Sequence, residues 1–183
     1  MKKVITFALQ KGGVGKTSIS VSVAVALAQN NYRVLLIDSD PQGNATTWLD
    51  IQEMNLELAD VLMRKCFIKE AILPTKVENL SIIPTAALGS ELRVYSKTEA
   101  NGRPMILRRI LREIKDDFDY VIIDTSPAFG PLEESCLLAS DEAITMVDEN
   151  LYYAIKEQLT GGQTVNKDLS SYPYVVDVNG ETI

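Results

Sequence analysis

The stretch that decides the fold is "FALQKGGVGKTSIS", residues 7–20. A phosphate-binding loop reads G-x-x-x-x-G-K-[ST], in which backbone N–H groups surround the phosphates, the lysine reaches the outer ones and the hydroxyl binds magnesium. Residues 15–17, Gly-Lys-Thr, match the end of that pattern, whereas Gln10 stands where its first glycine belongs. The stretch is therefore a variant phosphate-binding loop with an additional lysine, Lys11.

The residues on either side of the loop predict a strand and a helix. The preceding run "KVITFALQ" is apolar and β-branched, as expected of a strand. The following "SISVSVAV" alternates like a strand, but the Lys-Thr start and the Asn pair that ends "AVALAQNN" favour a buried helix. A helix here points its N-terminus at a bound anion. Six matching residues in this context are more specific than the alternative, a glycine-rich turn without a ligand.

Composition predicts one globular domain over residues 1–183. The chain is 46% hydrophobic, which suits a sizeable core. No apolar run approaches the roughly 20 residues that span a bilayer, and "MKK" leads into a strand rather than a cleavable signal, so we expect a cytoplasmic protein. Cys66 and Cys136 are far apart and histidine is absent, which predicts ordinary buried thiols rather than disulfides or a histidine-containing zinc site.

Charge is distributed unevenly along the chain. The net charge of −7 argues against a general nucleic-acid binder. Residues 91–115, however, carry seven basic and three acidic side chains. This basic stretch is either a contact face or a solvated helix face or dimer rim.

Further apolar runs alternate with helical patterns. Residues 33–40 and 120–127 are continuous apolar runs that end in acids, and 79–86 and 142–148 are shorter or weaker candidates for strands. Helical spacing occurs in "ELADVLMRK" and in "PMILRRILREIKDDF", whose apolar face comprises Leu107, Ile110, Leu111 and Ile114. This order predicts an α/β fold with a mostly parallel sheet and a ligand site at the carboxyl ends of its strands.

Three acids fall at those strand ends, beside the phosphate-binding loop. Phosphoryl transfer needs cations for the phosphates, a magnesium held by a hydroxyl and a strand-end Asp, and a group that places the water. Lys16, Thr17 and Asp124 supply the first two requirements, and Asp40 suits the third. For Asp38 two roles stay open: shaping the water shell of the magnesium, or forming a turn or helix cap.

The motifs "KGGVGKT", "VLLIDSDPQGNAT" and "DYVIIDTSP" together resemble, in order and spacing, the partitioning ATPases of the ParA type. These belong to the larger group of deviant Walker A P-loop NTPases that includes MinD and the nitrogenase iron protein. The resemblance runs over residues 3–159. It implies a three-layer P-loop NTPase fold in which helices flank a twisted sheet. It further implies that ATP and Mg²⁺ close two protomers into a homodimer.

The resemblance also assigns roles to individual residues. Lys11 is expected to reach the phosphates of the partner protomer, while Lys16 and Thr17 bind phosphate and magnesium. Asp40 is expected to position the attacking water, and Asp124 to support the metal through water. The remaining residues of the phosphate cradle are Gly12, Gly13, Val14, Gly15 and Ser18. The implied activity is hydrolysis of ATP to ADP and phosphate, which drives plasmid or chromosome partitioning with a ParB-like activator.

The end of the sequence departs from this family pattern. Family members continue after the helix that corresponds to residues 150–159 with further strands and helices, whereas here a divergent tail, 160–183, follows, so we expect a shortened C-terminal part. Its "VVDVNGETI" predicts two short strands about an Asn-Gly turn. Late basic residues contact DNA in the family, and only Lys156 and Lys167 are present, which leaves nonspecific DNA binding and nucleoid association open.

Rival functions require features that the sequence lacks. A MinD-like membrane role needs a basic amphipathic C-terminal helix, and "YPYVVDVNGETI" is not one. An iron–sulfur carrier of the nitrogenase type needs paired interface cysteines, which the spacing of Cys66 and Cys136 does not match. The remaining alternative is a truncated, nonhydrolytic nucleotide-binding module that pairs with partner proteins.

Overall fold

The computed structural model describes residues 1–8, 13, 15–128 and 130–145 of the 183-residue chain. The helix expected at 150–159 and the hairpin expected at 175–183 lie outside the described residues. Lys156 and Lys167 also lie outside the described residues. The same is true of the segment that was expected to form a shortened C-terminal part. Within the described ranges the chain forms six strands, six α-helices and two 3-10 helices.

The core of the molecule is a six-stranded sheet with the order β3-β4-β2-β5-β1-β6. Its strands are β1 (Lys3–Phe7), β2 (Val34–Ser39), β3 (Leu73–Pro74), β4 (Leu80–Ile83), β5 (Tyr120–Thr125) and β6 (Glu142–Ile144). Every neighbouring pair is parallel except β3 with β4. The prediction of a mostly parallel sheet is therefore confirmed. The antiparallel edge strand β3 was not predicted.

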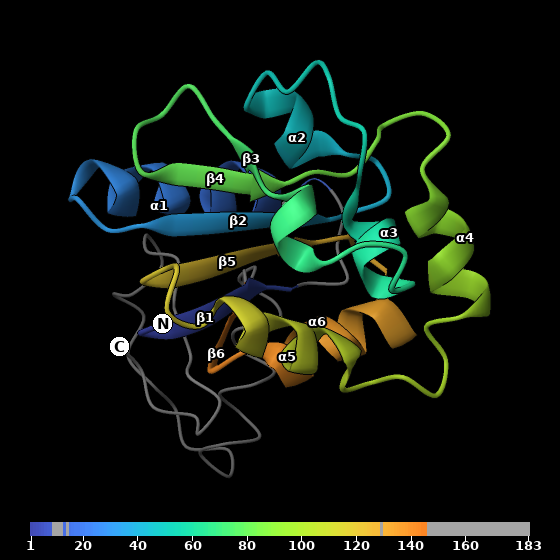
Figure 1. The fold of residues 1–183 in the computed structure, drawn as a ribbon. Coiled ribbons are helices and arrows are strands. Elements are labelled where there is room, and N and C mark those ends of the chain that lie inside the picture. The colour runs from blue at the N-terminus through green and yellow to red at the C-terminus, as the bar shows by residue number, and fades with distance from the viewer. Residues whose placement is uncertain (9–12, 14, 129, 146–183) are drawn as a thin grey trace, which may run out of the picture.

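Helices cover both faces of this sheet, so that the fold has three layers (Figure 1). The helices are α1 (Lys16–Gln29), α2 (Asn44–Trp48), α3 (Leu58–Leu62), α4 (Glu91–Thr98), α5 (Ile106–Leu111) and α6 (Pro131–Ala139), with short 3-10 helices η1 (Ile68–Ala71) and η2 (Arg112–Ile114). Helices α1 and α2 pack on one face, and α3 to α6 on the other. Within the described part of the chain, no helix is long and apolar enough to cross a membrane.

Both faces of the central strands are buried, which explains their continuous apolar sequences. On β2, Leu35 and Ile37 join the core beneath α3 to α6, whereas Val34 and Leu36 join the core beneath α1 and α2. Alternate side chains of a strand point to opposite faces, so a strand with a helix layer on each side needs apolar residues at every position.

Helix α1 forms despite its strand-like local sequence. Its buried residues after the first turn are Ser20, Val21, Ala24 and Ala28, which recur every three or four positions along one face. The helix ends at Gln29 with Asn30 as its C-cap, and Asn31 adopts a left-handed φ of 65°, as expected of an Asn pair that stops a helix. The predicted order of strand, loop and helix is thus confirmed.

Helix α5 buries the predicted apolar face but is shorter than its pattern suggested. Leu107, Ile110, Leu111 and Ile114 are all at most 2% exposed. The α-helix ends at Leu111, and the chain continues as the 3-10 helix η2. The sequence did not predict α2, α4 and α6.

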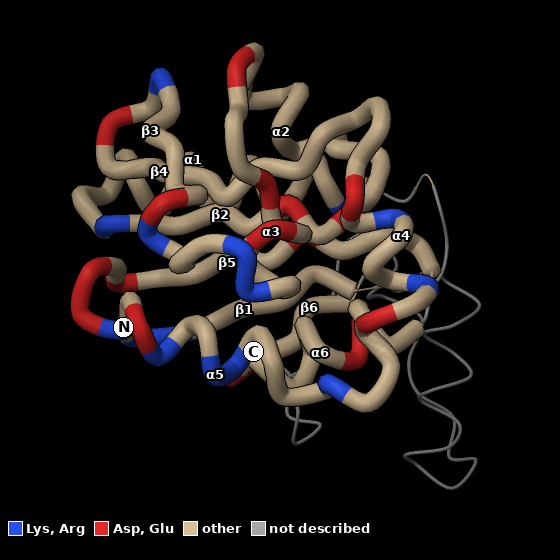
Figure 2. Tube along the Cα trace, turned by 45° about the vertical axis from the view of Figure 1, so that its right-hand side comes forward, with Lys and Arg blue, Asp and Glu red and all other residues tan. Residues whose placement is uncertain are grey.

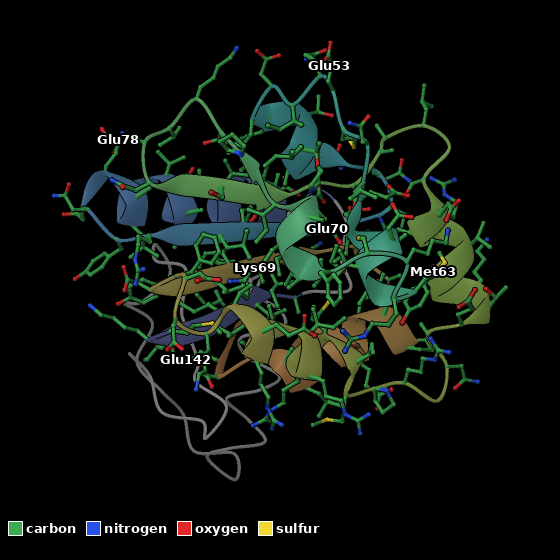
Figure 3. The ribbon with its side chains drawn as sticks, in the orientation of Figure 1. Glu53, Met63, Lys69, Glu70, Glu78 and Glu142 are labelled. Atoms are coloured by element: carbon green, nitrogen blue, oxygen red, sulfur yellow. The ribbon has the colours of Figure 1, made fainter. Side chains whose placement is uncertain are left out.

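The basic stretch 91–115 covers α4, α5 and their connection. All seven of its basic side chains are exposed. Figure 2 shows basic and acidic segments interspersed in this region, and Arg64 pairs with Glu113 at 2.7 Å. Other acids, such as Glu53 and Glu78, extend outward from surface loops (Figure 3). The stretch is exposed, and its function as a contact face stays a prediction.

The two cysteines should differ sharply in reactivity. Cys136 is completely buried, and burial raises the pKa of its thiol to about 12 despite a 3.2 Å contact with the Ser39 hydroxyl. Cys66 is only half-buried. Because the thiolate is the nucleophile, iodoacetamide at pH 8 should label Cys66 in the native protein and Cys136 only after denaturation. Mass spectrometry after timed labelling measures this, with Cys66→Ser as the control; equal labelling of both native thiols would contradict the packing.

Candidate functional site

A cavity of about 390 Å³ lies at the carboxyl ends of the strands. Its lining residues come from the phosphate-binding loop and α1, from the segment after β2, and from the segment after β5. From the loop and α1 these are Gly13, Gly15, Lys16, Thr17 and Ser18. From the other two segments they are Asp40, Gln42, Asn44, Trp48, Thr125 and Pro127. The site therefore lies where the parallel sheet predicts it.

The described part of the loop has the backbone of an anion-binding turn. Gly13 and Gly15 adopt φ values of 74° and 86°, in the left-handed region that favours glycine. Gly15 is the N-cap of α1. The N-terminus of a helix directs unpaired N–H groups and a partial positive charge at an anion, and Lys16, the first residue of α1, adds a full charge there. Lys11, Gly12 and Val14 lie outside the described residues.

Two buried carboxylates lie side by side beneath the cavity. Asp38 on β2 is paired in register with Asp124 on β5, and both are 0% exposed. Burial raises the pKa of Asp38 to about 7, and the neighbouring Asp124 adds to the rise. Burial likewise raises the pKa of Asp124 to about 6, against hydrogen bonds from the side chains of Thr17 and Ser20 that lower it. Unfavourable burial of two negative charges is thus the dominant electrostatic feature of the site.

The surroundings of Asp124 suit a divalent cation. Its Oδ1 accepts a hydrogen bond of 2.9 Å from Ser20, whereas its Oδ2 is buried without a hydrogen-bond partner among the described residues. Thr17, whose side chain lowers the pKa of this carboxyl, lines the cavity. In the described ranges no three acidic or cysteine side chains converge on a common metal position. This donor set fits Mg²⁺, which is usually held by one or two protein groups, water and substrate phosphates.

Asp40 lies at the cavity wall and is 5% exposed. Its backbone N–H donates to Asp38 Oδ1 at 3.3 Å, and its own Oδ1 accepts from the Gln42 N–H at 2.9 Å. The backbone N–H of Gly43 donates to the Asp40 carbonyl at 2.9 Å. The structure therefore brings Asp40, Lys16 and Thr17 to one cavity, as the sequence predicted.

Asp38 has a position that favours its structural role. Its Oδ2 accepts from both the backbone N–H and the hydroxyl of Thr46, at 2.8 and 2.6 Å. With the Asp40 N–H on Oδ1, these bonds attach α2 to the end of β2. The sequence left two roles open for Asp38: shaping the water shell of the magnesium, or forming a turn or helix cap. These contacts match the second role.

Sequence reasoning missed part of the site. Gln42 and Asn44 line the cavity and belong to the motif "DPQGNAT", which supplied a signal for them. Trp48, the last residue of α2, also lines it and is 60% exposed, but no motif indicated this position. Thr46 is the last residue of the same motif, but its bond to Thr85, 39 positions away, had no signal in the sequence.

Comparison with known proteins identifies the family. Residues 2–167 match the family described as AAA domain. The chain is 39% identical to the sporulation initiation inhibitor protein Soj of Bacillus subtilis over 160 residues, which cover 85% of this chain and 62% of that protein. It is 32% identical to the chromosome-partitioning ATPase Soj of Treponema pallidum, with 98% of this chain and 70% of that one covered. The chain belongs to the ParA/MinD family.

Solved structures agree with this assignment. A cobyrinic acid a,c-diamide synthase from Mycobacterium smegmatis, with bound ATP analogue and magnesium, matches with a TM-score of 0.75 and 28% identity over 87% of this chain and 70% of that one. The septum site-determining protein MinD from Pyrococcus horikoshii, complexed with Mg-ADP, matches with a TM-score of 0.70 and 26% identity over 86% and 66%. The P-loop NTPase fold is therefore confirmed. The ParA/MinD chain described here spans 62% of the length of the Bacillus relative.

Gly43, the N-cap of α2, should tolerate a side chain less well than another left-handed glycine. A Cβ at Gly43 would lie 2.5 Å from the Thr85 carbonyl oxygen and 2.9 Å from the Ala87 nitrogen, whereas Gly89 has open space. Both have positive φ. Gly89→Ala should therefore lower the free energy of unfolding by about 1 kcal/mol, and Gly43→Ala by about 2–4 kcal/mol through added overpacking. Chemical denaturation measures both; equal losses would show that Gly43 is not closely packed.

Proposed function

We propose that this ParA/MinD-family chain is an ATP- and Mg²⁺-dependent dimerising ATPase, which hydrolyses ATP to ADP and phosphate to drive plasmid or chromosome partitioning. The observation that carries the proposal is the convergence of Lys16, Thr17 and Asp40 on one cavity above the buried Asp124. Family membership supports the partitioning role, since the relatives include a chromosome-partitioning ATPase.

Each of these residues has a defined task in the proposed reaction. Lys16 and the N-terminus of α1 bind the phosphates, and Thr17 and Asp124 hold the magnesium, Asp124 through water. Magnesium held there would supply positive charge that offsets the charge of the phosphates. Asp40 accepts a hydrogen bond from the water and orients it toward the terminal phosphate. The rest of the cradle is assigned to Gly12, Gly13, Val14, Gly15 and Ser18.

Dimerisation links association to hydrolysis in this proposal. Lys11 is assigned to the phosphates of the partner protomer, where a cation that arrives only on pairing stabilises the transition state as an arginine finger does. A ParB-like activator, a cytoplasmic location and nonspecific DNA binding stay predictions. For DNA, the exposed basic stretch 91–115 is the described surface to test.

The two lysines of the loop should have separable effects. Lys16→Ala should weaken ATP binding by at least about 10-fold, because a charge-assisted hydrogen bond contributes about 1.5–3 kcal/mol. Lys11→Ala should leave ATP binding by the monomer intact and abolish pairing. Titration with a fluorescent ATP analogue measures affinity, and light scattering after size exclusion measures mass without nucleotide, with ADP, and with a slowly hydrolysed analogue plus Mg²⁺. Equal loss of affinity in both variants would count against these assignments.

The same measurement separates the ATPase from its alternative. A native dimer that forms only with the ATP analogue supports the proposed switch. A native monomer under every condition, with nucleotide still bound, favours the nonhydrolytic interaction module.

Asp40→Ala should slow hydrolysis by about 100-fold, because it removes the group assigned to the water. The variant should consequently accumulate as an ATP-bound dimer at saturating ATP and Mg²⁺. Phosphate release and light scattering follow the two effects. A variant that stays monomeric, or that hydrolyses ATP at the native rate, would refute the role of Asp40.

A further inference from the structure

A closed ring of buried hydrogen bonds joins three segments next to the cavity. The ring consists of Asp38 at the end of β2, Thr46 in α2 and Thr85 after β4, each at most 2% exposed. Thr46 Oγ1 donates to Asp38 Oδ2 at 2.6 Å and accepts from the Thr85 N–H at 3.0 Å. Thr85 Oγ1 donates to the Asp38 carbonyl at 2.6 Å and closes the ring.

The chemistry of these groups gives Thr46 a unique part in the ring. A backbone N–H can only donate, and Asp38 Oδ2 already accepts from the Thr46 N–H, so a group between the Thr85 N–H and this oxygen must both accept and donate. A hydroxyl has one donor and two acceptor positions and meets this need in the space of one atom. Valine has nearly the shape of threonine, with a methyl group in place of the hydroxyl. The hydroxyl of Thr46 is therefore separable by mutation from its packing.

The ring holds the loop that carries Asp40. The loop runs from Asp38, whose Oδ1 accepts from the Asp40 N–H, to Thr46, whose N–H and hydroxyl both reach Asp38 Oδ2. Between them, Gly43 packs its backbone against the carbonyl of Thr85, with no room for a side chain. The loop is thus attached at both ends and in the middle.

The segment after Thr85, against which the loop packs, is itself held by the buried carboxylate of Glu57. Glu57 accepts from the Ala86 N–H at 2.8 Å, the Ser90 hydroxyl at 3.0 Å and the Glu91 N–H at 2.7 Å. These bonds fix the chain that follows Thr85 up to the start of α4. The chain next to Thr85 is therefore attached to Glu57 at Ala86, and again at Ser90 and Glu91.

We propose that Asp38 and Thr46 are positioning residues, which hold the Asp40 carboxylate in the orientation that hydrolysis requires without touching the nucleotide. Neither side chain lines the cavity. The inference rests on the proposed ATPase function. Loss of the ring should misplace Asp40 and reduce turnover, while the phosphate-binding loop and α1, on the other side of the cavity, retain the nucleotide.

The decisive variant is Thr46→Val, with Thr47→Val as its matched control. The neighbouring Thr47 is exposed, and its hydroxyl donates to the carbonyl of Gly43 within the helix turn, at 2.9 Å. Thr46→Val should lower the turnover number for ATP by about 10- to 100-fold, as misplacement of a reacting group does. The dissociation constant for a slowly hydrolysed ATP analogue with Mg²⁺ should change by less than about 2-fold, because a factor of 2 is only about 0.4 kcal/mol of binding free energy. Thr46→Ser should restore turnover, and Thr47→Val should keep the native values.

The outcomes distinguish the inference from the function on which it rests. Native turnover in Thr46→Val, or equal losses of turnover and affinity, would overturn the positioning role and leave the ATPase intact. A native chain that does not hydrolyse ATP would overturn both. If Thr46→Val does not fold, Thr85→Val removes the bond that closes the ring from the opposite side, and the same split between turnover and affinity must appear there.

Discussion

The site depends on placing two carboxylates, Asp38 and Asp124, side by side inside the sheet. Burial disfavours their charged forms and raises both pKa values, to about 7 and about 6. Such burial is tolerated where hydrogen-bond donors, a cation or protonation of the carboxyl compensates it. Asp38 receives three hydrogen bonds, including two from Thr46, whereas Asp124 keeps one buried oxygen without a partner among the described residues. One acid therefore serves as an anchor, and the other is left available for a metal.

Strands and the first helix were predictable because their signals are local. Residues of β2 such as Leu35 and Leu36 face opposite helical layers, so burial on both sides produces an uninterrupted apolar run. Helix α1 could be recognised despite its alternating sequence, since the phosphate-binding loop before it and the Asn pair after it mark its ends. The carboxyl-end location of Asp40 and Asp124 then follows from parallel topology alone.

The elements that were missed lack such signals. Helix α4 has eight residues and buries only Leu92 and Tyr95, which are too few apolar positions for a repeat to be recognised in the sequence. Helix α2 has five residues and is held by Asp38 and Thr85, which lie 8 and 39 positions from Thr46. Contacts of that kind arise only when distant segments meet in the folded chain, and no local pattern encodes them. The hydrogen bonds between Glu57 and the start of α4 could not be predicted either, because they join residues 33 and 34 positions apart.

The two edges of the sheet differ in what they can accept. At one edge, β3 is two residues long and antiparallel, and its second residue is Pro74, which has no N–H to offer a further strand. At the other edge lies β6, paired in parallel with β1 and containing no proline. Among the described residues, β6 is consequently the edge strand without a proline to block a further strand, and in the sheet order it lies on the opposite side of β5 and β1 from β2, whose end carries the loop with Asp40.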